Sequence, residues 1–201
     1  MNKVLEHNLI NISAFVSFLD NIDNNKVVYE IENYSQEIDP KHKDSYLKKH
    51  YNTHYEDKKY PQTEECEKLK FLISKKVNEI LQKEMKMESI WSLTLGKGQS
   101  VSYHSHKSNS HLHPIDYYSI AYYPSAPEGS ANLLFHTTAF NQIDSMSSIK
   151  PETGMLVIFN SFIPHMTDRH NSDTSRIVVS ANFSLVNVNT RIVPDWSPYD
   201  V

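Results

Sequence analysis

The chain has 201 residues, of which 39% are apolar and 22% are charged, and its formal net charge is −4. This length suits one domain with a substantial core, and the acidic balance gives no whole-molecule attraction to nucleic acid or to an anionic membrane. Cys66 is the single cysteine, so no internal disulfide can form, and no apolar run approaches the length of about 18 residues that spans a membrane. The N-terminal stretch lacks the features of a signal peptide, so we expect a cytoplasmic protein.

The first predicted element is a helix that begins near Ile12. Apolar residues recur from there at helical spacing, namely Ile12, Phe15, Val16, Leu19 and Ile22. Residues 34–62 are polar, rich in lysine and tyrosine, and aperiodic, which predicts a loop or short irregular elements.

The clearest predicted helix spans residues 63–86. Thr63 is its candidate N-cap, and Glu64, Glu65 and Glu67 stand in the first turn, where the helix dipole favours negative charge. An apolar stripe follows, made of Leu69, Leu72, Ile73, Val77, Ile80 and Leu81. We expect this helix to pack against the flank of a sheet.

After Ser89 the pattern changes to short apolar runs of period two, separated by turns. The candidate strands are SIWSLTL, QSVSYH, YYSIAYY, ANLLFH, GMLVIF and RIVVSANFSL. The turns are marked by Gly96-Lys97-Gly98, Pro127-Glu128-Gly129 and Pro151-Glu152-Thr153-Gly154. Such a series predicts a two-layer sandwich or jelly roll, with ligands entering between the sheets.

Eleven histidines are the unusual feature of the composition, and four of them fall between residues 104 and 113. In an extended segment, residues two apart project to the same side, so His104 and His106 can offer two imidazoles to one metal ion. His111 and His113 form a second pair of the same kind. His165, which follows a strand-like run, is the third candidate ligand.

Arg176 opens the next β-branched run, eleven residues after His165. Its planar guanidinium matches a carboxylate through two hydrogen bonds, and Ser180 should share its face of the strand. A buried, unpaired arginine is costly, so an inward Arg176 implies an anionic partner. The alternative is a structural pairing with an aspartate or an outward side chain.

The segment from Trp91 to Leu185 resembles the iron(II)- and 2-oxoglutarate-dependent dioxygenases, especially the short phage and bacterial members related to prolyl hydroxylases. The resemblance rests on Gly96-Lys97-Gly98, His104-Ser105-His106, SIAYYPSAPEGSANLLF, the strand from Pro151 to Phe159, His165 and Arg176. It covers roughly the last half of the chain, and its most specific part is the interval from His165 to Arg176.

The resemblance implies a mainly β fold with flanking helices (α+β), in which a double-stranded β-helix, or jelly roll, forms the core. We expect one domain over residues 1–201, with an N-terminal helical and irregular part at 1–88, the core at 89–188 and a tail at 189–201. The resemblance further implies iron(II) held by His104, His106 and His165, with 2-oxoglutarate bound by Arg176 and Ser180. The enzyme would consume O2, convert 2-oxoglutarate to succinate and CO2, and hydroxylate a C–H bond of a protein, peptide or small-molecule substrate.

Two features depart from the family pattern. A histidine occupies the place of the usual carboxylate ligand, so the iron would be more positive than in a site with two histidines and one carboxylate. The H-x-H motif is also doubled. The interval from Gly98 favours His104 and His106 as ligands, whereas the following HPIDYYSIAYY favours His111 and His113, and we expect the first pair.

Two other functions remain open at this point. A cupin-type metalloprotein or dioxygenase with three histidines would have the same kind of barrel without 2-oxoglutarate, but it would give Arg176 no role. A non-enzymatic binding jelly roll would leave the histidines and Arg176 unexplained.

Overall fold

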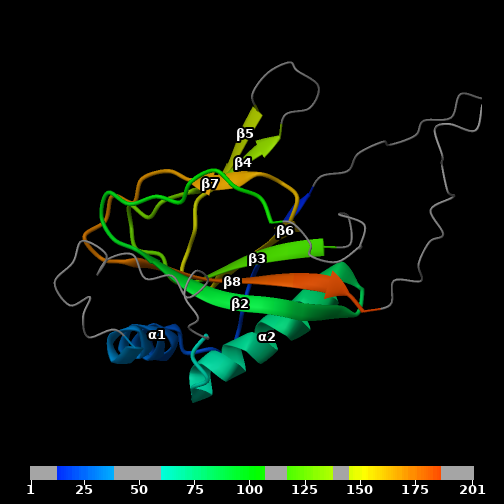
Figure 1. Cartoon of the computed structure of the whole chain (residues 1–201), viewed down its shortest axis with the longest axis horizontal. Coiled ribbons are helices and arrows are strands. Elements are labelled where there is room, and N and C mark those ends of the chain that lie inside the picture. Colours follow the sequence, from blue (N-terminus) through cyan, green and yellow to red (C-terminus); the bar gives the residue numbers. More distant parts are fainter. Residues whose placement is uncertain (1–12, 39–59, 107–116, 138–144, 187–201) are drawn as a thin grey trace, which may run out of the picture.

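The computed structural model describes residues 13–38, 60–106, 117–137 and 145–186. In chain order the elements are β1 (Ala14–Phe18), α1 (Asn24–Ile38), α2 (Glu64–Leu81), β2 (Met85–Leu95), β3 (Tyr117–Ser125), β4 (Leu133–Thr137), β5 (Ser145–Ile149), β6 (Met155–Asn160), β7 (His165–Thr167) and β8 (Arg176–Leu185). They form a five-stranded sheet in the order β1-β6-β3-β8-β2 and a three-stranded sheet in the order β5-β4-β7, with antiparallel pairing throughout. The helices lie below the large sheet and the small sheet lies above it (Figure 1). The predicted jelly-roll architecture is therefore confirmed.

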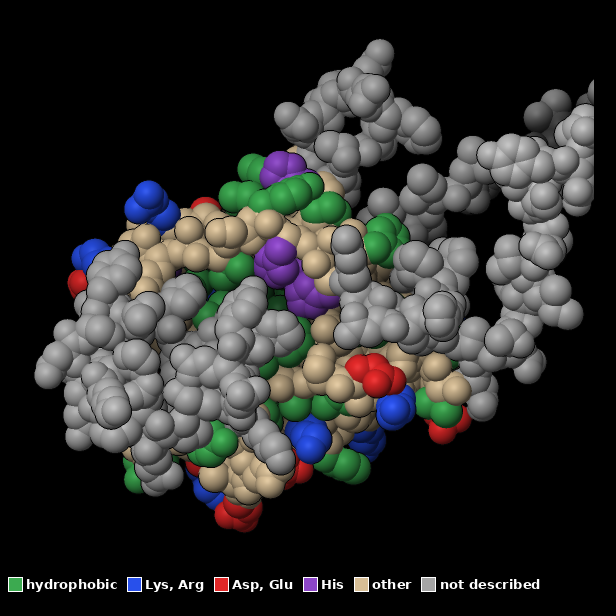
Figure 2. Space-filling view, in the orientation of Figure 1, with side chains coloured by type: hydrophobic (Ala, Val, Ile, Leu, Met, Phe, Trp, Pro, Cys, Tyr) green, Lys and Arg blue, Asp and Glu red, His purple; other side chains and the backbone are tan. Residues whose placement is uncertain are grey.

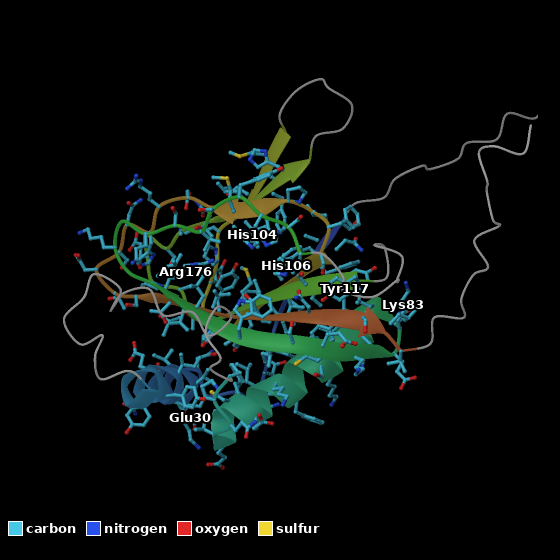
Figure 3. All side chains as sticks on the ribbon, viewed as in Figure 1. Glu30, Lys83, His104, His106, Tyr117 and Arg176 are labelled. Carbon is cyan, nitrogen blue, oxygen red and sulfur yellow. The ribbon has the colours of Figure 1, made fainter. Side chains whose placement is uncertain are left out.

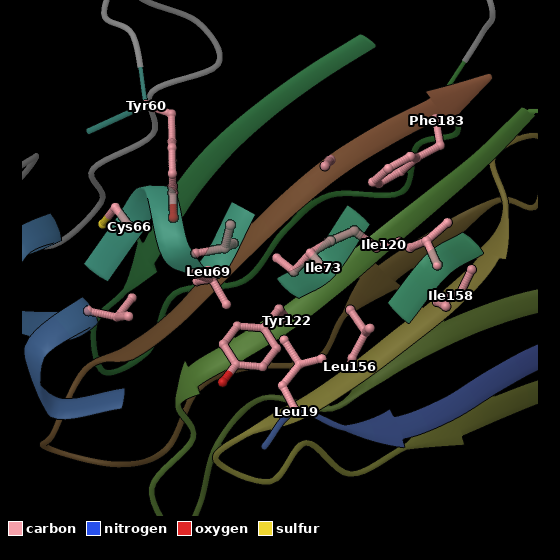
Figure 4. Close-up of a cluster of buried hydrophobic side chains, with 14 of the residues drawn as sticks. Leu19, Tyr60, Cys66, Leu69, Ile73, Ile120, Tyr122, Leu156, Ile158 and Phe183 are labelled. Atoms are coloured by element: carbon pink, nitrogen blue, oxygen red, sulfur yellow. The ribbon is translucent and has the colours of Figure 1, made fainter. Parts of the chain in front are cut away.

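Strand β8 illustrates how the sheet separates two cores. Ile177, Val179 and Phe183 point toward the helices, where they join a cluster with Leu69 and Ile73 of α2 (Figure 4). The alternate residues of β8, which begin with Arg176 and Val178, face the small sheet, because successive side chains of a strand point to opposite faces. The space between the two sheets, which holds the candidate site, therefore has its own apolar lining.

The N-terminus of α2 is capped by a residue from the other helix. The carboxylate of Glu30 accepts hydrogen bonds from the backbone N–H groups of Glu65 and Cys66 and from the hydroxyl of Thr63. Thr63 does stand at the N-cap, as predicted, but its own side chain makes no capping bond. Partial burial opposes ionisation of Glu30, yet the hydrogen bonds from Thr63, Cys66 and Glu65 outweigh it and lower the pKa. This contact ties α1 to α2.

The prediction of a helix that begins near Ile12 is wrong, because residues 14–18 form strand β1. This strand pairs with β6 from Ala14 opposite Phe159 to Phe18 opposite Met155. A short run of β-branched and aromatic residues fits both periods, and backbone pairing with an open sheet edge decided between them. The large sheet thus takes a strand from the stretch predicted to be helical and irregular, and α1 extends into the predicted loop at 34–62.

Other boundaries also differ from the prediction. Helix α2 ends at Leu81 rather than near residue 86, because Gln82 adopts a left-handed conformation (φ 51°) and β2 begins at Met85. The run 99–104 forms no regular strand, whereas β5 and β7 were not predicted. Within the described residues, neither helix is long and apolar enough to cross a membrane.

Candidate metal and co-substrate site

Three histidines meet in the space between the sheets. The segment 101–106 runs beside residues 161–167, held by backbone hydrogen bonds from His104 N–H to His165 (3.0 Å), from His165 N–H to His104 (2.8 Å) and from His106 N–H to Ser161 (2.9 Å). The pairing departs from a regular ladder at Val101, whose N–H donates to the Thr167 hydroxyl in place of a carbonyl. The segment is nevertheless extended, so His104 and His106 project to one side.

The candidate ligand atoms of His104, His106 and His165 all lie within 4.8 Å of one another. This was the first of the two predicted ligand sets. The second pair, His111 and His113, lies outside the described residues. His165 follows the end of β6, as predicted, and begins the short strand β7.

The surroundings of each ring select the nitrogen that faces the shared point. Nδ1 of His104 lies 2.7 Å from the Ser102 carbonyl oxygen, and Nδ1 of His165 lies 2.9 Å from that of Ile163. A carbonyl oxygen can only accept, so both Nδ1 atoms carry the proton and both Nε2 atoms carry a lone pair. Nδ1 of His106 lies 2.8 Å from the amide oxygen of Asn182, which has the same effect. This arrangement is typical of metal-binding histidines.

Burial favours the neutral form of His165. Burial lowers the pKa of His165 to about 3, and the neighbouring His104 and His106 act in the same direction against a hydrogen bond to Ile163. Neutral imidazole is the form that binds metal. Within the described chain the grouping contains no carboxylate. The donor set therefore fits a divalent ion of intermediate softness, such as iron(II).

The histidines lie at the edge of an apolar recess. His104 and His106 are partly exposed, whereas His165 is buried against Phe159, with 4.8 Å between the ring centroids. Figure 2 shows histidine side chains at the surface of this face, beside a recess lined by hydrophobic side chains. A ligand can therefore reach the histidines from solvent while its far end enters an apolar interior.

Arg176 is the buried cation of this interior. Its relative exposure is 2%, and within the described residues neither Nε nor Nη1 has a hydrogen-bond partner. The guanidinium carbon lies 4.8 Å from the centroid of the Tyr123 ring, and interaction with the Tyr123 side chain raises the pKa of Arg176 against the effect of burial. Figure 3 shows Arg176 in the same space between the sheets as His104 and His106.

The nearby carboxylate does not satisfy this arginine. Asp168 accepts hydrogen bonds from the backbone and side-chain amides of Asn132, at 2.6 and 2.7 Å, and acts on Arg176 only as a nearby charge. Burial lowers the pKa of Arg176, although interactions with Tyr123 and Asp168 oppose this. Arginine nevertheless remains protonated in proteins. The interior therefore holds a cation whose Nε and Nη1 have no acceptor among the described residues, and an entering carboxylate fits this place.

Ser180 shares the face of Arg176, as predicted, because it lies four residues further along β8. It stands opposite Trp91 of β2 and Ala121 of β3. The sequence reasoning missed Asn182, two residues further on, which contacts His106. The alternation of Arg176, Ser180 and Asn182 along one strand was the signal that could have revealed it.

The model of the family described as "Putative 2OG-Fe(II) oxygenase" matches residues 89–182. HygX from Streptomyces hygroscopicus, solved with nickel and 2-oxoglutarate bound, is 10% identical with a TM-score of 0.64 over 87% of this chain and 83% of its own. The viral collagen prolyl hydroxylase of Paramecium Bursaria Chlorella virus-1 is 16% identical with a TM-score of 0.57, and covers 88% of this chain and 96% of its own. A Pseudomonas putida prolyl-4-hydroxylase is 13% identical with a TM-score of 0.56, over 88% and 93%. No curated protein matches the sequence.

At these identities the solved structures establish the fold, which is the double-stranded β-helix. The family match spans β2 to β8 and so contains every residue of the histidine grouping together with Arg176. Over residues 89–182 the chain therefore matches the iron(II)- and 2-oxoglutarate-dependent oxygenase family, and its fold is the fold of these enzymes.

Proposed function

We propose that this oxygenase hydroxylates a C–H bond of an organic substrate, with iron(II) held by His104, His106 and His165 and 2-oxoglutarate held by Arg176. The observation that carries the proposal is the pairing of two unlike features in one interior. Three imidazoles present lone pairs toward a common point, and two nitrogens of a buried guanidinium have no hydrogen-bond partner in the part of the chain that the structure describes. The first feature suits a metal, and the second suits the far carboxylate of a dicarboxylic acid.

The protein's contribution on the metal side is orientation. The hydrogen bonds of the three Nδ1 atoms hold the rings before any ion arrives, so little ordering remains when a metal binds. Three protein ligands leave coordination positions for a co-substrate. Iron(II), when bound, would supply the redox chemistry that no side chain provides.

On the co-substrate side, Arg176 and Tyr123 form the anion site. Both the guanidinium and the Tyr123 hydroxyl can donate to one carboxylate, and a charged donor in a dry interior makes strong hydrogen bonds. Ser180 lies on the same face and completes the predicted set. The surrounding apolar residues, among them Leu93, Leu95 and Val178, exclude water from these bonds.

Arg176 also separates this function from the two alternatives. A cupin-type metal site needs the histidines but gives the buried Arg176 no purpose, and a binding jelly roll explains neither feature. The single cysteine requires no oxidising compartment, which is compatible with the cytoplasmic location proposed here.

The test is metal and co-substrate titration. Wild-type protein should bind manganese(II) in calorimetry, should bind 2-oxoglutarate more tightly when metal is present, and should release succinate with iron(II) and O2. His165→Ala should abolish metal binding, because two imidazoles compete poorly with water for the ion. His136→Ala is the matched control, since this partly buried histidine packs on Tyr103 outside the grouping. Metal binding without any effect of 2-oxoglutarate would contradict the proposal.

A further inference from the structure

We infer that Asn182 is a positioning residue, which fixes the proton of His106 on Nδ1 and so directs Nε2 at the metal. The inference rests on the proposed function for its consequence, although the hydrogen bonds that carry it belong to the protein alone. It concerns the ligand that stands where the family pattern has a carboxylate. Nothing in the H-x-H motif itself determines which nitrogen of that histidine faces the metal.

His106 differs from the other two histidines in how it is held. His104 and His165 each form a hydrogen bond through Nδ1 to the backbone carbonyl two residues earlier in the chain, so their orientation is set locally. His106 instead forms a hydrogen bond to a side chain of the five-stranded sheet, with 2.8 Å between its Nδ1 and the amide oxygen of Asn182. Of these three contacts, this is the one that a single substitution can remove.

A buried chain of hydroxyls fixes the direction of the contact. The Ser119 hydroxyl donates to the amide oxygen of Asn182 at 2.8 Å, and the hydroxyls of Ser119 and Ser161 lie 2.7 Å apart. Ser119 has one proton and gives it to Asn182, so it accepts from Ser161. Although Ser119 lies 3.2 Å from Nδ1 of His106, it has no second proton for that nitrogen.

With the amide oxygen of Asn182 facing His106 and Ser119, proton counting leaves one arrangement. Without a proton, Nδ1 of His106 would present its lone pair to an amide oxygen and to a hydroxyl oxygen whose proton is already used. With the proton on Nδ1, the imidazole donates to Asn182, and Nε2 carries the lone pair that a metal needs. The Asn182 side chain also forms a hydrogen bond with Tyr117. Burial raises the pKa of Tyr117, and this hydrogen bond acts in the opposite direction.

The fold supplies the position of Asn182. Ser119 and Asn182 are register partners on β3 and β8, and both are buried. The backbone N–H of His106 donates to the carbonyl of Ser161, so the main chain and ring of His106 meet the same cluster. The five-stranded sheet thus holds a ligand that belongs to a segment beside the three-stranded sheet. A neutral amide in this role orients the ring without adding charge to a site that already lacks a carboxylate.

Three variants test the inference. Asn182→Leu removes the acceptor at similar volume. Asn182→Asp keeps an acceptor at the same place but cannot donate. Ser184→Ala is the matched control, because Ser184 lies on the same face of β8, is buried, and bonds to Glu88 rather than to a histidine.

The first measurement needs no metal. Nitrogen-15 NMR of the metal-free wild type, at about pH 8 where imidazole is neutral, should show the proton of His106 on Nδ1. A proton on Nε2 would overturn the inference. This result holds whether or not Asn182→Leu folds, and it does not depend on the proposed function.

The second measurement is manganese(II) affinity by calorimetry. Asn182→Leu should bind about 10- to 100-fold more weakly than wild type, the usual effect of losing a partner of a metal-bound histidine. Asn182→Asp should restore binding to at least the wild-type level, and Ser184→Ala should leave it unchanged. Equal affinity of wild type and Asn182→Leu would overturn the inference, as would an equal loss in the Asp and Leu variants. A wild type that binds no manganese would instead overturn the proposed function.

Discussion

Replacing Arg176 by leucine should produce two effects of opposite sign, and together they test whether this residue is an anion site. In the metal-free protein the buried guanidinium has no hydrogen-bond partner for Nε or Nη1 within the described residues. Burying an incompletely satisfied charge is costly, so Arg176→Leu should leave the free energy of unfolding unchanged or raise it by about 1–4 kcal/mol. A structural arginine would behave in the opposite way and destabilise the protein when removed.

Binding of 2-oxoglutarate should change in the other direction. Two charge-assisted hydrogen bonds of about 1.5–3 kcal/mol each would be lost, partly offset because the leucine leaves no unpaired charge behind. The net loss should be about 2–4 kcal/mol, which is roughly 30- to 1000-fold in affinity. Arg169→Leu is the control, because this exposed arginine lies outside the interior and, among the described residues, is 3.5 Å from the Gly98 carbonyl.

A second ligand isolates the contact within the same assay. 2-Oxopentanoate has the length of 2-oxoglutarate but carries a methyl group in place of the far carboxylate. In calorimetry with manganese-loaded protein, wild type and Arg176→Leu should bind it equally, so the cycle of two proteins and two ligands gives the coupling energy directly. A coupling near zero would refute the assignment of Arg176 to the far carboxylate.

Two further predictions concern the ligand pairs and the helix contact. His104→Ala/His106→Ala should lose manganese binding in calorimetry, whereas His111→Ala/His113→Ala should keep it; the reverse result would move the site to the second pair. Glu30→Gln should lower the free energy of unfolding by about 0.5–2 kcal/mol at pH 7, because it weakens the cap of α2. Glu79→Gln is the control: it removes the ion pair with Lys76 at the surface of α2 and should change the free energy of unfolding little. Folding lowers the pKa of Glu30 from 4.5, so the difference in free energy of unfolding between wild type and Glu30→Gln should be fully present above pH 4.5 and should vanish as the pH falls through the lowered pKa. A difference that persists in acid would contradict the role of the carboxylate.

The strands of the core were predictable because burial on one or both faces imposes a pattern on them. β2, β3, β4, β6 and β8 were all expected, each within a few residues of its observed bounds. Period two and continuous β-branched runs are strong signals for strands of this kind. The elements that were missed lack that signal: β7 has three residues, and β5 has two serines and a methionine exposed at its centre.

The histidines and the arginine that the structure brings together could be singled out from the sequence, but the residues that support them could not. His104, His106, His165 and Arg176 stand out because such residues are costly inside a protein without a partner. Asn182 and Ser119 carry no such mark, since a buried polar residue on a strand is common and the sequence does not give the register that brings β3 beside β8. Glu30 was missed for the same reason, because its contact with Thr63 joins two helices that are far apart in the sequence.

The charges of the site predict a strong coupling between metal and co-substrate. Three neutral imidazoles cancel none of the charge of a divalent ion, and Arg176 adds a further positive charge to the same interior, where the described residues place no carboxylate in the histidine grouping. 2-Oxoglutarate carries two negative charges and would balance the charge of the ion, so each ligand should bind more tightly when the other is present. Linkage requires that the gain in metal affinity equals the gain in 2-oxoglutarate affinity. The measurement is manganese(II) affinity with and without saturating 2-oxoglutarate, and the reverse titration. We expect saturating 2-oxoglutarate to raise manganese affinity at least about tenfold in wild type and by a smaller factor in Arg176→Leu. Without 2-oxoglutarate, Arg176→Leu should bind manganese as tightly as wild type or more tightly, because the repelling cation is gone. Equal coupling in the two proteins would show that Arg176 does not contribute to this balance of charge.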